Sequence, residues 1–589
     1  MQQPITTLLK RLWHHVSPRR RRQFALLLIL TVLSSMAEVV SLGAVLPFIG
    51  ILTQPEKVFA SPWLAGSVRV LGITSGTELV LPLAIGFALA ALIAGGLRLL
   101  LLWVSIRLGN ATGADLSIEM YRRTLYQSYS VHIARSSSEI ISGITQKVGT
   151  TTSVMISVVA VITSTSLFVA IIITLLTIDP MVAIVAVMSF GSAYGLIAWH
   201  TRHRLVDNSQ CIAQEQTQVV KALQEGLGAI RDVLLDGTQK VYCSIYQKAI
   251  LQLQRAGSEN TFINQAPRYA MEALGMALIA IFVLALSHGA GGVVVALPIL
   301  AMLALGAQRL LPLMQQLYGN WSLVAGSAAT LSDVLALLEQ PLPAGVNLPE
   351  LEPLILKQGI TFENVSFKYT SNAPWVLYDI NLTIPKGSRV GIIGATGSGK
   401  STAVDLLMGL LEPTQGQILV DGKVVGASNH RAWQRSVAHV PQSIFLADAT
   451  IAENIAFGIP PDKIDFDCVR YAAEQARISE FIESRPESYG EIVGERGIRL
   501  SGGQRQRIGI ARALYKQANV IIFDEATSAL DNETEHAVMQ AIESLSKDLT
   551  LLIIAHRLTT LKNCTQIVEL GAGSIKRAGS YQDIVNKAV

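Results

Sequence analysis

A glycine-rich loop in the second half of the chain has the residue types needed to hold phosphate. Residues 394–401 read Gly-Ala-Thr-Gly-Ser-Gly-Lys-Ser, which matches the pattern G-x-x-x-x-G-K-[ST]. An apolar run at 390–393 precedes the loop and a helical pattern at 402–411 follows it, as a strand–loop–helix phosphate site requires. Backbone N–H groups of such a loop wrap phosphate oxygens, Lys400 adds positive charge, and Ser401 is a ligand for Mg²⁺. The pattern predicts a site for ATP with Mg²⁺.

Two carboxylates downstream of this loop could complete the chemistry of a nucleotide hydrolase. The apolar run at 520–523 reads as a buried strand, and it ends in Asp524 and Glu525. Asp524 is placed to hold Mg²⁺, and Glu525 to act as general base toward the attacking water. An apolar strand ending in Asp-Glu is common by itself, so its position after the phosphate loop carries the argument. The loop residues expected to bind the nucleotide are Gly394, Thr396, Gly397, Ser398, Gly399, Lys400, Ser401 and Thr402.

The segment Leu-Ser-Gly-Gly-Gln at 500–504 resembles the signature motif of ABC ATPases, and it lies upstream of the Asp-Glu strand as in that family. Physically, a hydroxyl and backbone N–H groups at a helix N-terminus form an anion site. In the family this motif grips the γ-phosphate of ATP held by the other subunit. The resemblance therefore implies nucleotide contacts for Ser501, Gly502, Gly503 and Gln504.

Further family motifs follow in the family's order along the second half. Gln442 resembles the glutamine that senses Mg²⁺ and contacts the membrane half, so it is a candidate catalytic residue and metal ligand. His556 resembles the switch histidine at the γ-phosphate, and Asp531 resembles the last residue of the D-loop. Tyr369 resembles the aromatic residue that stacks on adenine, and 494–497 resembles an exporter-specific coupling loop. A structural histidine at 556 and a strand-core role for Tyr369 are the alternatives.

The chain around these motifs divides into an apolar first half and a second half with the composition of an ordinary globular domain. Hydrophobic residues make up 50% of the chain and charged residues only 15%, with a mean hydropathy of +0.42, whereas soluble domains have about 25% charged residues. The long uncharged runs lie between 24 and 320, so this part is expected in a membrane. A net charge of +4 gives no reason to expect a nucleic-acid partner. The four cysteines are scattered without a C-x-x-C pair and are expected as reduced thiols.

Six stretches are long and apolar enough to be membrane-spanning helices. They are expected at 24–52, 79–106, 154–177, 181–199, 270–288 and 292–313. Basic residues gather before the first, after the second and after the fourth stretch, which places both termini in the cytoplasm. The two long inner loops have helical patterns, so the helices are expected to extend beyond the bilayer. The outer loop at 53–78 could hold a short interfacial helix or a packed cap.

Six helices followed by this ATPase resemble an ABC exporter half-transporter over nearly the whole chain. The expected fold is a helical membrane domain (1–338), a proline-rich linker (339–355) and an α/β P-loop ATPase domain (356–589). The resemblance implies a location in the cell inner (plasma) membrane, and intact motifs favour a homodimer with two equivalent sites. It also implies coupling seats on the ATPases, expected around 132–141 and 226–235, where solvated helical loops are the alternative.

Motifs in the membrane half resemble the lipid-linked oligosaccharide flippases of the PglK type. They lie at 38–43, 46–48, 266–272 and 309–312. Arg98 and Arg309 lie about 28 and 26 Å along their spans from the outer ends, and Arg268 enters the fifth span at its inner end. Such arginines suit an anionic partner, although they could snorkel, and Glu272 could neutralise Arg268. The expected cargo is a phosphorylated lipid-linked glycan moved to the outer leaflet. Drugs, peptides or other lipids are the alternative cargo, and an ATP-gated channel or regulator is a further possibility.

Overall fold

A computed structural model describes the chain over residues 3–44, 48, 78–178, 180–287, 310–343, 352–426, 428–525, 540, 548–555 and 558–585. The chain forms two compact units. The first comprises residues 1–127 and 135–341, and the second comprises 128–134 and 342–589. The predicted outer loop lies almost wholly outside the described residues, as do residues 344–351 of the predicted linker and most of the sixth predicted span.

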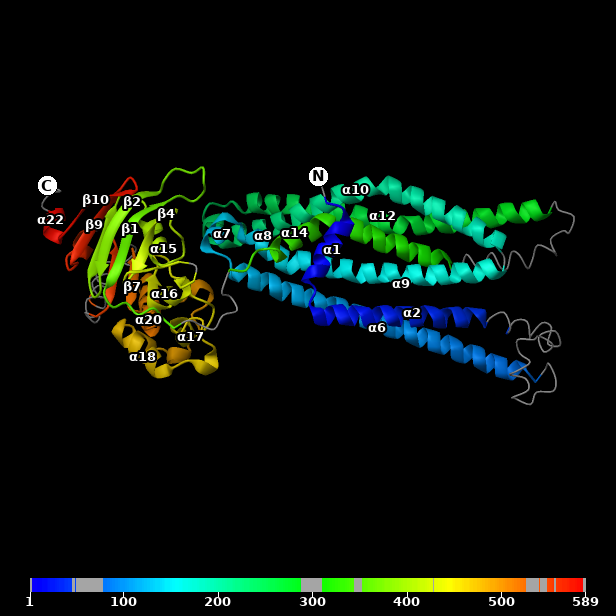
Figure 1. Cartoon of the computed structure of the whole chain (residues 1–589), viewed down its shortest axis with the longest axis horizontal. Coiled ribbons are helices and arrows are strands. Elements are labelled where there is room, and N and C mark those ends of the chain that lie inside the picture. The colour runs from blue at the N-terminus through cyan, green and yellow to red at the C-terminus, as the bar shows by residue number, and fades with distance from the viewer. Residues whose placement is uncertain are drawn as a thin grey trace. The chain divides into compact units, whose positions relative to one another are not determined.

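The first unit consists of long helices that run side by side (Figure 1). Their bounds are α1 Ile5–His15, α2 Pro18–Gly43, α6 Val80–Leu125, α8 Ser137–Ser142, η1 Gly143–Lys147, α9 Val148–Ile178, α10 Pro180–Gly228, α11 Ile230–Leu235, α12 Gln239–Ser287 and α14 Ala328–Leu338. Helix α6 has 46 residues, and α10 and α12 have 49 each, so each is about 70 Å long and exceeds the ~30 Å hydrocarbon core. These helices are thus long enough to extend beyond a bilayer, as expected from the sequence.

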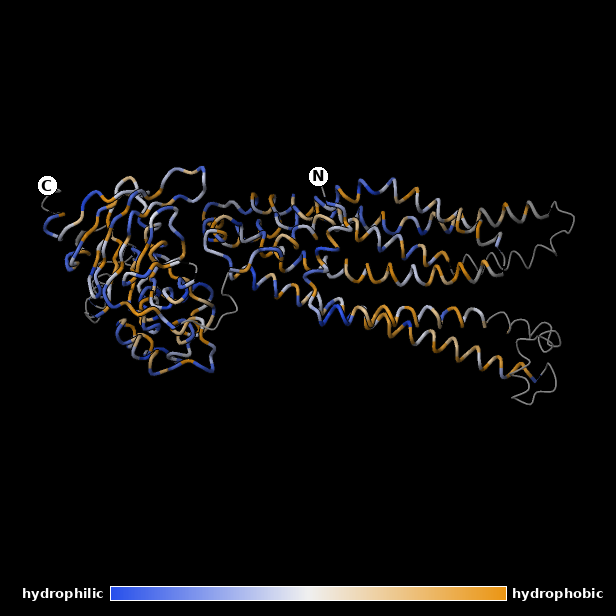
Figure 2. Tube along the Cα trace, viewed as in Figure 1, coloured by the Kyte–Doolittle hydropathy of each residue, from blue (hydrophilic) through white to orange (hydrophobic). Residues whose placement is uncertain are grey.

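Apolar sequence concentrates where the membrane spans were expected. Among the described residues, three segments are long and apolar enough to cross a membrane, namely Pro18–Ser41, Val80–Leu125 and Ser137–Ile173. A fourth, Leu310–Ala325 with Ala328–Leu338, qualifies as a pair bent by 53°. The predicted span at 181–199 lies within α10, and residues 270–287 of the predicted span at 270–288 lie within α12. Figure 2 shows the apolar parts of α6 and α9 at the same end of the unit.

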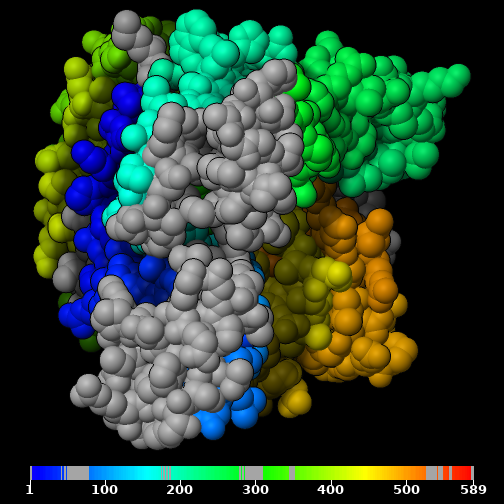
Figure 3. Space-filling model, turned by 90° about the vertical axis from the view of Figure 1, so that its right-hand side faces the viewer, coloured from blue at the N-terminus to red at the C-terminus, as the bar shows by residue number. Residues whose placement is uncertain are grey.

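Of the three buried clusters among the described residues of this unit, two are large. One joins Leu8 and Leu12 of α1 to Met120 of α6 and to Leu331 and Leu335 of α14. The other joins α10 and α12 through residues such as Phe190 and Ile263, and the atoms of these two helices adjoin in Figure 3. Helices α1 and α14 are far apart in sequence. The first cluster therefore packs the N-terminal helix of the unit against its C-terminal helix.

The second unit contains two sheets and a helical part. The smaller sheet has the order β2-β1-β4-β5 and is antiparallel. The larger has the order β10-β9-β3-β8-β7-β6, and its strands from β9 to β6 are parallel. The strands are β1 Gly359–Phe367, β2 Leu377–Pro385, β3 Arg389–Gly394, β4 Gln415–Val420, β5 Lys423–Val424, β6 Val437–Val440, β7 Val520–Asp524, β8 Thr550–Ile554, β9 Gln566–Gly571 and β10 Ser574–Gly579.

The helices of the second unit lie on two separate cores. Helix α15 Lys400–Leu407 packs on one core with the strands around β1, whereas α17 Ile451–Ile455, α18 Phe466–Gln475 and α20 Gly502–Tyr515 pack on the other. Among the described residues, this unit also contains α16 His430–Ser436, α19 Ser479–Glu483 and α22 Tyr581–Val585, besides α7, which is described below. The predicted order of a helical domain followed by an α/β domain is confirmed.

The two stretches predicted as coupling seats do not both fall in one unit. Helix α7 Tyr129–Ala134 belongs to the second unit, but the rest of the stretch predicted at 132–141 lies in α8 and the first unit. The stretch predicted at 226–235 corresponds to the end of α10 and to α11, both in the first unit. The positions of the coupling seats therefore stay predictions.

Candidate nucleotide site

The parallel part of the larger sheet brings the sequence motifs together at one edge. Strands β3, β8, β7 and β6 are neighbours and point the same way, so their carboxyl ends meet. The phosphate loop follows β3, Asp524 ends β7, and Gln442 comes two residues after β6. Ligands of open α/β sheets bind at this edge. His556 follows β8 by two residues but lies outside the described residues, as does Asp531.

Glycines allow the phosphate loop to close tightly between β3 and α15. Gly397 and Gly399 have φ of +81° and +96°, a region that favours glycine. A Cβ on Gly399 would lie 2.6 Å from Leu377 Cδ2, whereas one on Gly397 would meet nothing within 4 Å. The loop is thus packed against β2 at Gly399 and open at Gly397, where a ligand could approach the backbone.

Buried polar groups under this loop have the chemistry of a phosphate site. Lys400 is buried, and its Nζ donates to the carbonyl oxygens of Gly394 at 2.8 Å and Ala395 at 3.1 Å. An ammonium has three donors, so these bonds leave one for a ligand. Ser398 is buried too, and in the described part of the chain its Oγ has no hydrogen-bond partner. A buried orphan hydroxyl is costly unless a ligand or water bonds it, so this cradle fits a phosphate.

The candidate base and the loop glutamine lie in direct contact. Gln442 Nε2 donates to Glu525 Oε2 at 2.8 Å, although the two residues are 83 apart in sequence. The pairing of β6 with β7 makes this possible, because both residues follow the carboxyl ends of these neighbouring strands. Glu525 has φ of +47°, a conformation uncommon for a side-chain-bearing residue. Such strain is typical of functional positions.

The candidate adenine-stacking residue lies beside the same loop. Tyr369 lies just past the end of β1 and is 47% exposed, and its hydroxyl is 3.2 Å from Thr402 Oγ1. Its ring packs edge-on against Phe367, which is 6% exposed. The core position of this strand end is thus occupied by Phe367, which leaves a face of Tyr369 available for a base. The strand-core alternative for Tyr369 is wrong.

The signature segment begins a different helix on the other core. Ser501 is the N-cap of α20, where its Oγ accepts from Gln504 N at 3.3 Å and its N–H donates to Gln504 Oε1 at 2.8 Å. Such a capping box satisfies two helix-end donors and still leaves the serine hydroxyl proton free to donate. Ser501 and Gly502 are exposed, whereas Gly503 is buried. The segment is therefore a preformed, accessible helix N-terminus.

Asp405 is an acidic residue of the site that the sequence analysis missed. It lies on α15 one turn beyond Ser401, and this four-residue spacing was the available signal. Burial, and secondarily the nearby Asp524, raises the pKa of Asp405 to about 6. The negative field around Asp524 is thus shared by two carboxyl groups, which is a favourable setting for a divalent cation.

This raised pKa predicts a pH-dependent stability. A carboxyl whose pKa is higher in the folded state contributes stability that is complete below its unfolded pKa and is lost as the pH rises through about 6. Asp405→Asn should therefore raise the unfolding midpoint of the purified chain at pH 8 by about 2–4 °C, which corresponds to roughly 1 kcal/mol after allowing for solvent screening. The gain should vanish at pH 4. Exposed Asp462→Asn is the control, and an equal gain at both pH values would contradict the prediction.

The three candidate cargo arginines have different surroundings. Arg98 is exposed on α6 and lies about 27 Å from Val80 along the helix. It forms no ion pair with any of the described residues. Arg268 pairs with Glu272 at 3.0 Å, as the one-turn spacing predicted. It lies inside a continuous helix, because α12 runs through Pro267 from Gln239, and its position at the inner end of a span stays a prediction. Arg309 lies outside the described residues.

Both units match models of one protein family. Residues 24–304 match the ABC transporter transmembrane region, and residues 377–528 match the ABC transporter model. The second unit is therefore an ABC-type ATPase domain. The chain as a whole has the fold and domain order of an ABC exporter half-transporter. The structure of a bacterial Atm1-family ABC exporter with ATP bound has a TM-score of 0.78 to this chain, over 97% of this chain and 96% of that one, at 23% identity.

Curated relatives share a part of the chain at higher identity. The toxin RTX-I translocation ATP-binding protein of Actinobacillus pleuropneumoniae is 41% identical over 46% of this chain. The leukotoxin translocation ATP-binding protein LktB of Mannheimia glucosida is 39% identical over the same share. The matches span 37% and 38% of the lengths of these relatives.

Proposed function

We propose that this chain is a primary active transporter that hydrolyses ATP, with Mg²⁺, to move an amphipathic cargo across the inner membrane. One observation carries the proposal. In a chain with an ABC membrane region, the phosphate cradle and the Gln442–Glu525 pair converge at the carboxyl ends of neighbouring parallel strands. The proposed division is a membrane domain at 1–338, a linker at 339–355 and an ATPase domain at 356–589, with both termini cytoplasmic.

The site residues have separate tasks in this proposal. Lys400 and the loop N–H groups hold the terminal phosphates, and Tyr369 stacks on the adenine. Glu525 accepts a proton from the attacking water, and Gln442 fixes the orientation of that carboxylate through its 2.8 Å hydrogen bond. Ser401, Gln442 and Asp524 would hold Mg²⁺, which supplies charge neutralisation at the phosphates. His556 and Asp531 retain the roles that the motif order assigns to them.

A second copy of the chain would complete each site. One chain has a single phosphate loop and a single signature segment, and these begin helices on separate cores. The exposed helix N-terminus at Ser501 is a ready anion site for a nucleotide bound elsewhere. A homodimer with two equivalent sites uses both features.

We propose a phosphorylated, lipid-linked oligosaccharide or related glycolipid as cargo, moved from the cytoplasmic to the outer leaflet. An exposed arginine at the depth of Arg98 is costly in lipid unless it faces an anion or water, and a guanidinium binds phosphate in bidentate fashion. Arg309 has a similar computed depth, whereas the Glu272 pair makes Arg268 the weaker candidate. The relatives named for toxin translocation favour a polypeptide as the competing cargo.

The cargo proposal predicts that charge at two positions controls transport. In proteoliposomes, Arg98→Ala with Arg309→Ala should nearly abolish translocation of a pyrophosphate-linked glycolipid, because losing a guanidinium from a phosphate pair costs roughly 2–5 kcal/mol. Arg→Lys at both positions should retain part of the activity, and basal ATP hydrolysis should persist. Arg107→Ala is the control, since Arg107 lies over the Trp103 ring on the same helix. Wild-type translocation by the double alanine variant would exclude phosphate recognition by these arginines.

A further inference from the structure

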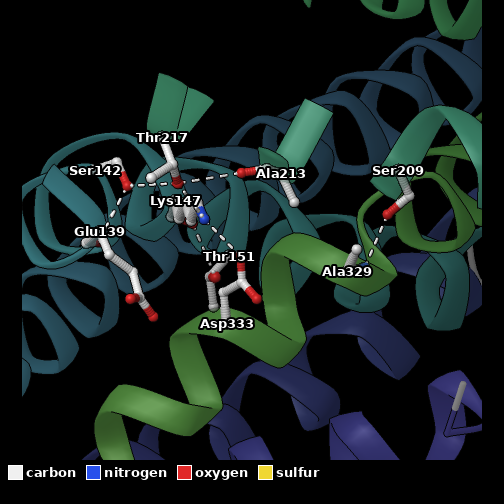
Figure 4. Close-up of polar contacts among 9 residues, drawn as sticks. All are labelled: Glu139, Ser142, Lys147, Thr151, Ser209, Ala213, Thr217, Ala329 and Asp333. Carbon is white, nitrogen blue, oxygen red and sulfur yellow. Dashed lines mark hydrogen bonds and ion pairs between the residues drawn. The ribbon is translucent and has the colours of Figure 1, made fainter. Parts of the chain in front are cut away.

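A lysine is buried among the helices of the first unit. Lys147 ends the π-helical turn η1, and its side chain is only 3% exposed. Its Nζ donates to Asp333 Oδ2 at 2.5 Å and to Thr217 Oγ1 at 3.0 Å. Figure 4 shows these side chains converging from three elements, η1, α10 and α14. One ammonium group therefore joins three helical segments that are far apart in sequence.

This arrangement specifies one packing of the three segments. A buried ammonium is strongly unfavourable unless it is paired and hydrogen-bonded. The carboxylate of Asp333 is 47% exposed and stays partly hydrated, so Lys147 is the member that depends on the contact. If α14 moved away from η1, the lysine would lose its counter-charge inside the protein. The pair therefore resists separation of α14 from η1 and α10.

Close packing one turn away reinforces the same contact. A Cβ on Gly143, the first residue of η1, would lie 2.4 Å from Leu337 Cδ1 of α14. Helix α14 is also tied to α10, because Ala329 N donates to Ser209 Oγ at 2.8 Å. π-Helical turns occur frequently at functional positions, and here the turn presents both Gly143 and Lys147 to α14. The contact is thus built from backbone proximity as well as from charge.

The elements joined by Lys147 adjoin the two places where the chain enters the ATPase unit. The first is α7 at 129–134, which directly precedes α8 and η1. The second begins at Leu342, shortly after α14 ends at Leu338. An ion pair between η1 and α14 therefore links the segment that follows the first entry to the segment that precedes the second.

We propose that Lys147 is a positioning residue that makes these two connections move together. Through the Asp333 and Thr217 contacts, a change in the ATPase unit would reach α9 and α10 as one movement. Without the charge, the ATPase could still turn over while the membrane helices respond incompletely. This inference rests on the proposed function, since it assumes that ATP drives a change in the membrane unit.

The test measures the response of the membrane unit directly. In full-length homodimers whose four cysteines are replaced, a spin label on Leu81→Cys, an exposed position near the start of α6, reports the distance between subunits. The distance is measured without nucleotide and with ATP plus vanadate. Lys147→Met keeps a long apolar side chain without charge. It should hydrolyse ATP within about twofold of wild type and lose at least about half of the nucleotide-dependent shift in population.

Variants of Asp333, which forms the ion pair with Lys147, separate the effect of charge from the effect of packing. Asp333→Asn should lose the nucleotide-dependent shift in label distance, as Lys147→Met does. Asp333→Glu should keep the shift, because the half-exposed site can accommodate a longer carboxylate. Combining Lys147→Met with Asp333→Asn should add little to either change. Lys221→Met, which removes an exposed lysine 3.8 Å from Glu225, should respond fully. If Lys147→Met fails to fold, the comparison of Asp333→Asn with Asp333→Glu still shows whether the nucleotide-dependent shift requires the ion pair.

Two outcomes overturn the inference in distinguishable ways. A full nucleotide-dependent shift in both Lys147→Met and Asp333→Asn would show that the pair is merely structural, and the proposed function would stand. A wild-type protein that neither hydrolyses ATP nor changes the label distance would remove the proposed function together with this inference.

Discussion

ATP turnover should fall by at least about 10²-fold when Glu525 is replaced by glutamine, because this change removes the proposed general base. The geometry makes the substitution specific. Gln442 Nε2 donates to Glu525 Oε2, and a glutamine side-chain oxygen at 525 can still accept that hydrogen bond. The phosphate loop and the buried Lys400 are unchanged, so ATP should still bind. Only the step that needs a proton acceptor is lost.

The measurement separates binding from hydrolysis. Phosphate release by the purified chain in detergent or lipid gives turnover, and labelled ATP retained after gel filtration gives occupancy. The Glu525→Gln protein should retain ATP, with the two ATPase domains held together. Glu474→Gln changes an exposed glutamate on α18 of the same unit and should keep wild-type turnover. Wild-type turnover by Glu525→Gln would exclude Glu525 as the base.

The sequence predicted most accurately what is encoded by contiguous residues. The phosphate loop at 394–401 is predictable because its pattern is continuous and lies between a strand and a helix, which the structure shows as β3 and α15. The Arg268–Glu272 pair was predictable because residues one helical turn apart are neighbours. In both cases local geometry alone determines the contact.

Contacts set by the tertiary fold were not predictable from spacing. The Gln442–Glu525 hydrogen bond depends on β6 lying beside β7, and motif order gave their roles but not their contact. Lys147 and Asp333 are 186 residues apart, and a lysine in a helical loop usually faces solvent. The coupling seats expected around 132–141 and 226–235 stay predictions for a similar reason, because a helical pattern alone does not say which surface a loop contacts. Such features require the packing of whole elements.

The proposed homodimer predicts that two inactive variants restore activity to each other. Lys400→Ala removes the phosphate-loop charge, and Ser501→Ala removes the signature hydroxyl at the N-terminus of α20. Each homodimer carries its defect in both sites, so each should be nearly inactive. In a mixed dimer, one site has both defects, whereas the other combines an intact Lys400 from one subunit with an intact Ser501 from its partner.

Equal mixing gives a quantitative expectation for this composite site. About half of the dimers are mixed and each contains one intact site of two, so turnover should reach about a quarter of wild type in the whole mixture and about half of wild type in isolated mixed dimers, if the sites act independently. The variants are co-expressed with different affinity tags, and mixed dimers are isolated through both tags before phosphate release is measured. Mixing Lys400→Ala with a differently tagged Lys400→Ala is the control and should stay inactive. If both motifs acted within one chain, each subunit of the mixed dimer would still be defective, and no activity would return at any mixing ratio. Recovery of activity in the doubly tagged dimers therefore distinguishes a site shared between two subunits from a site within one subunit.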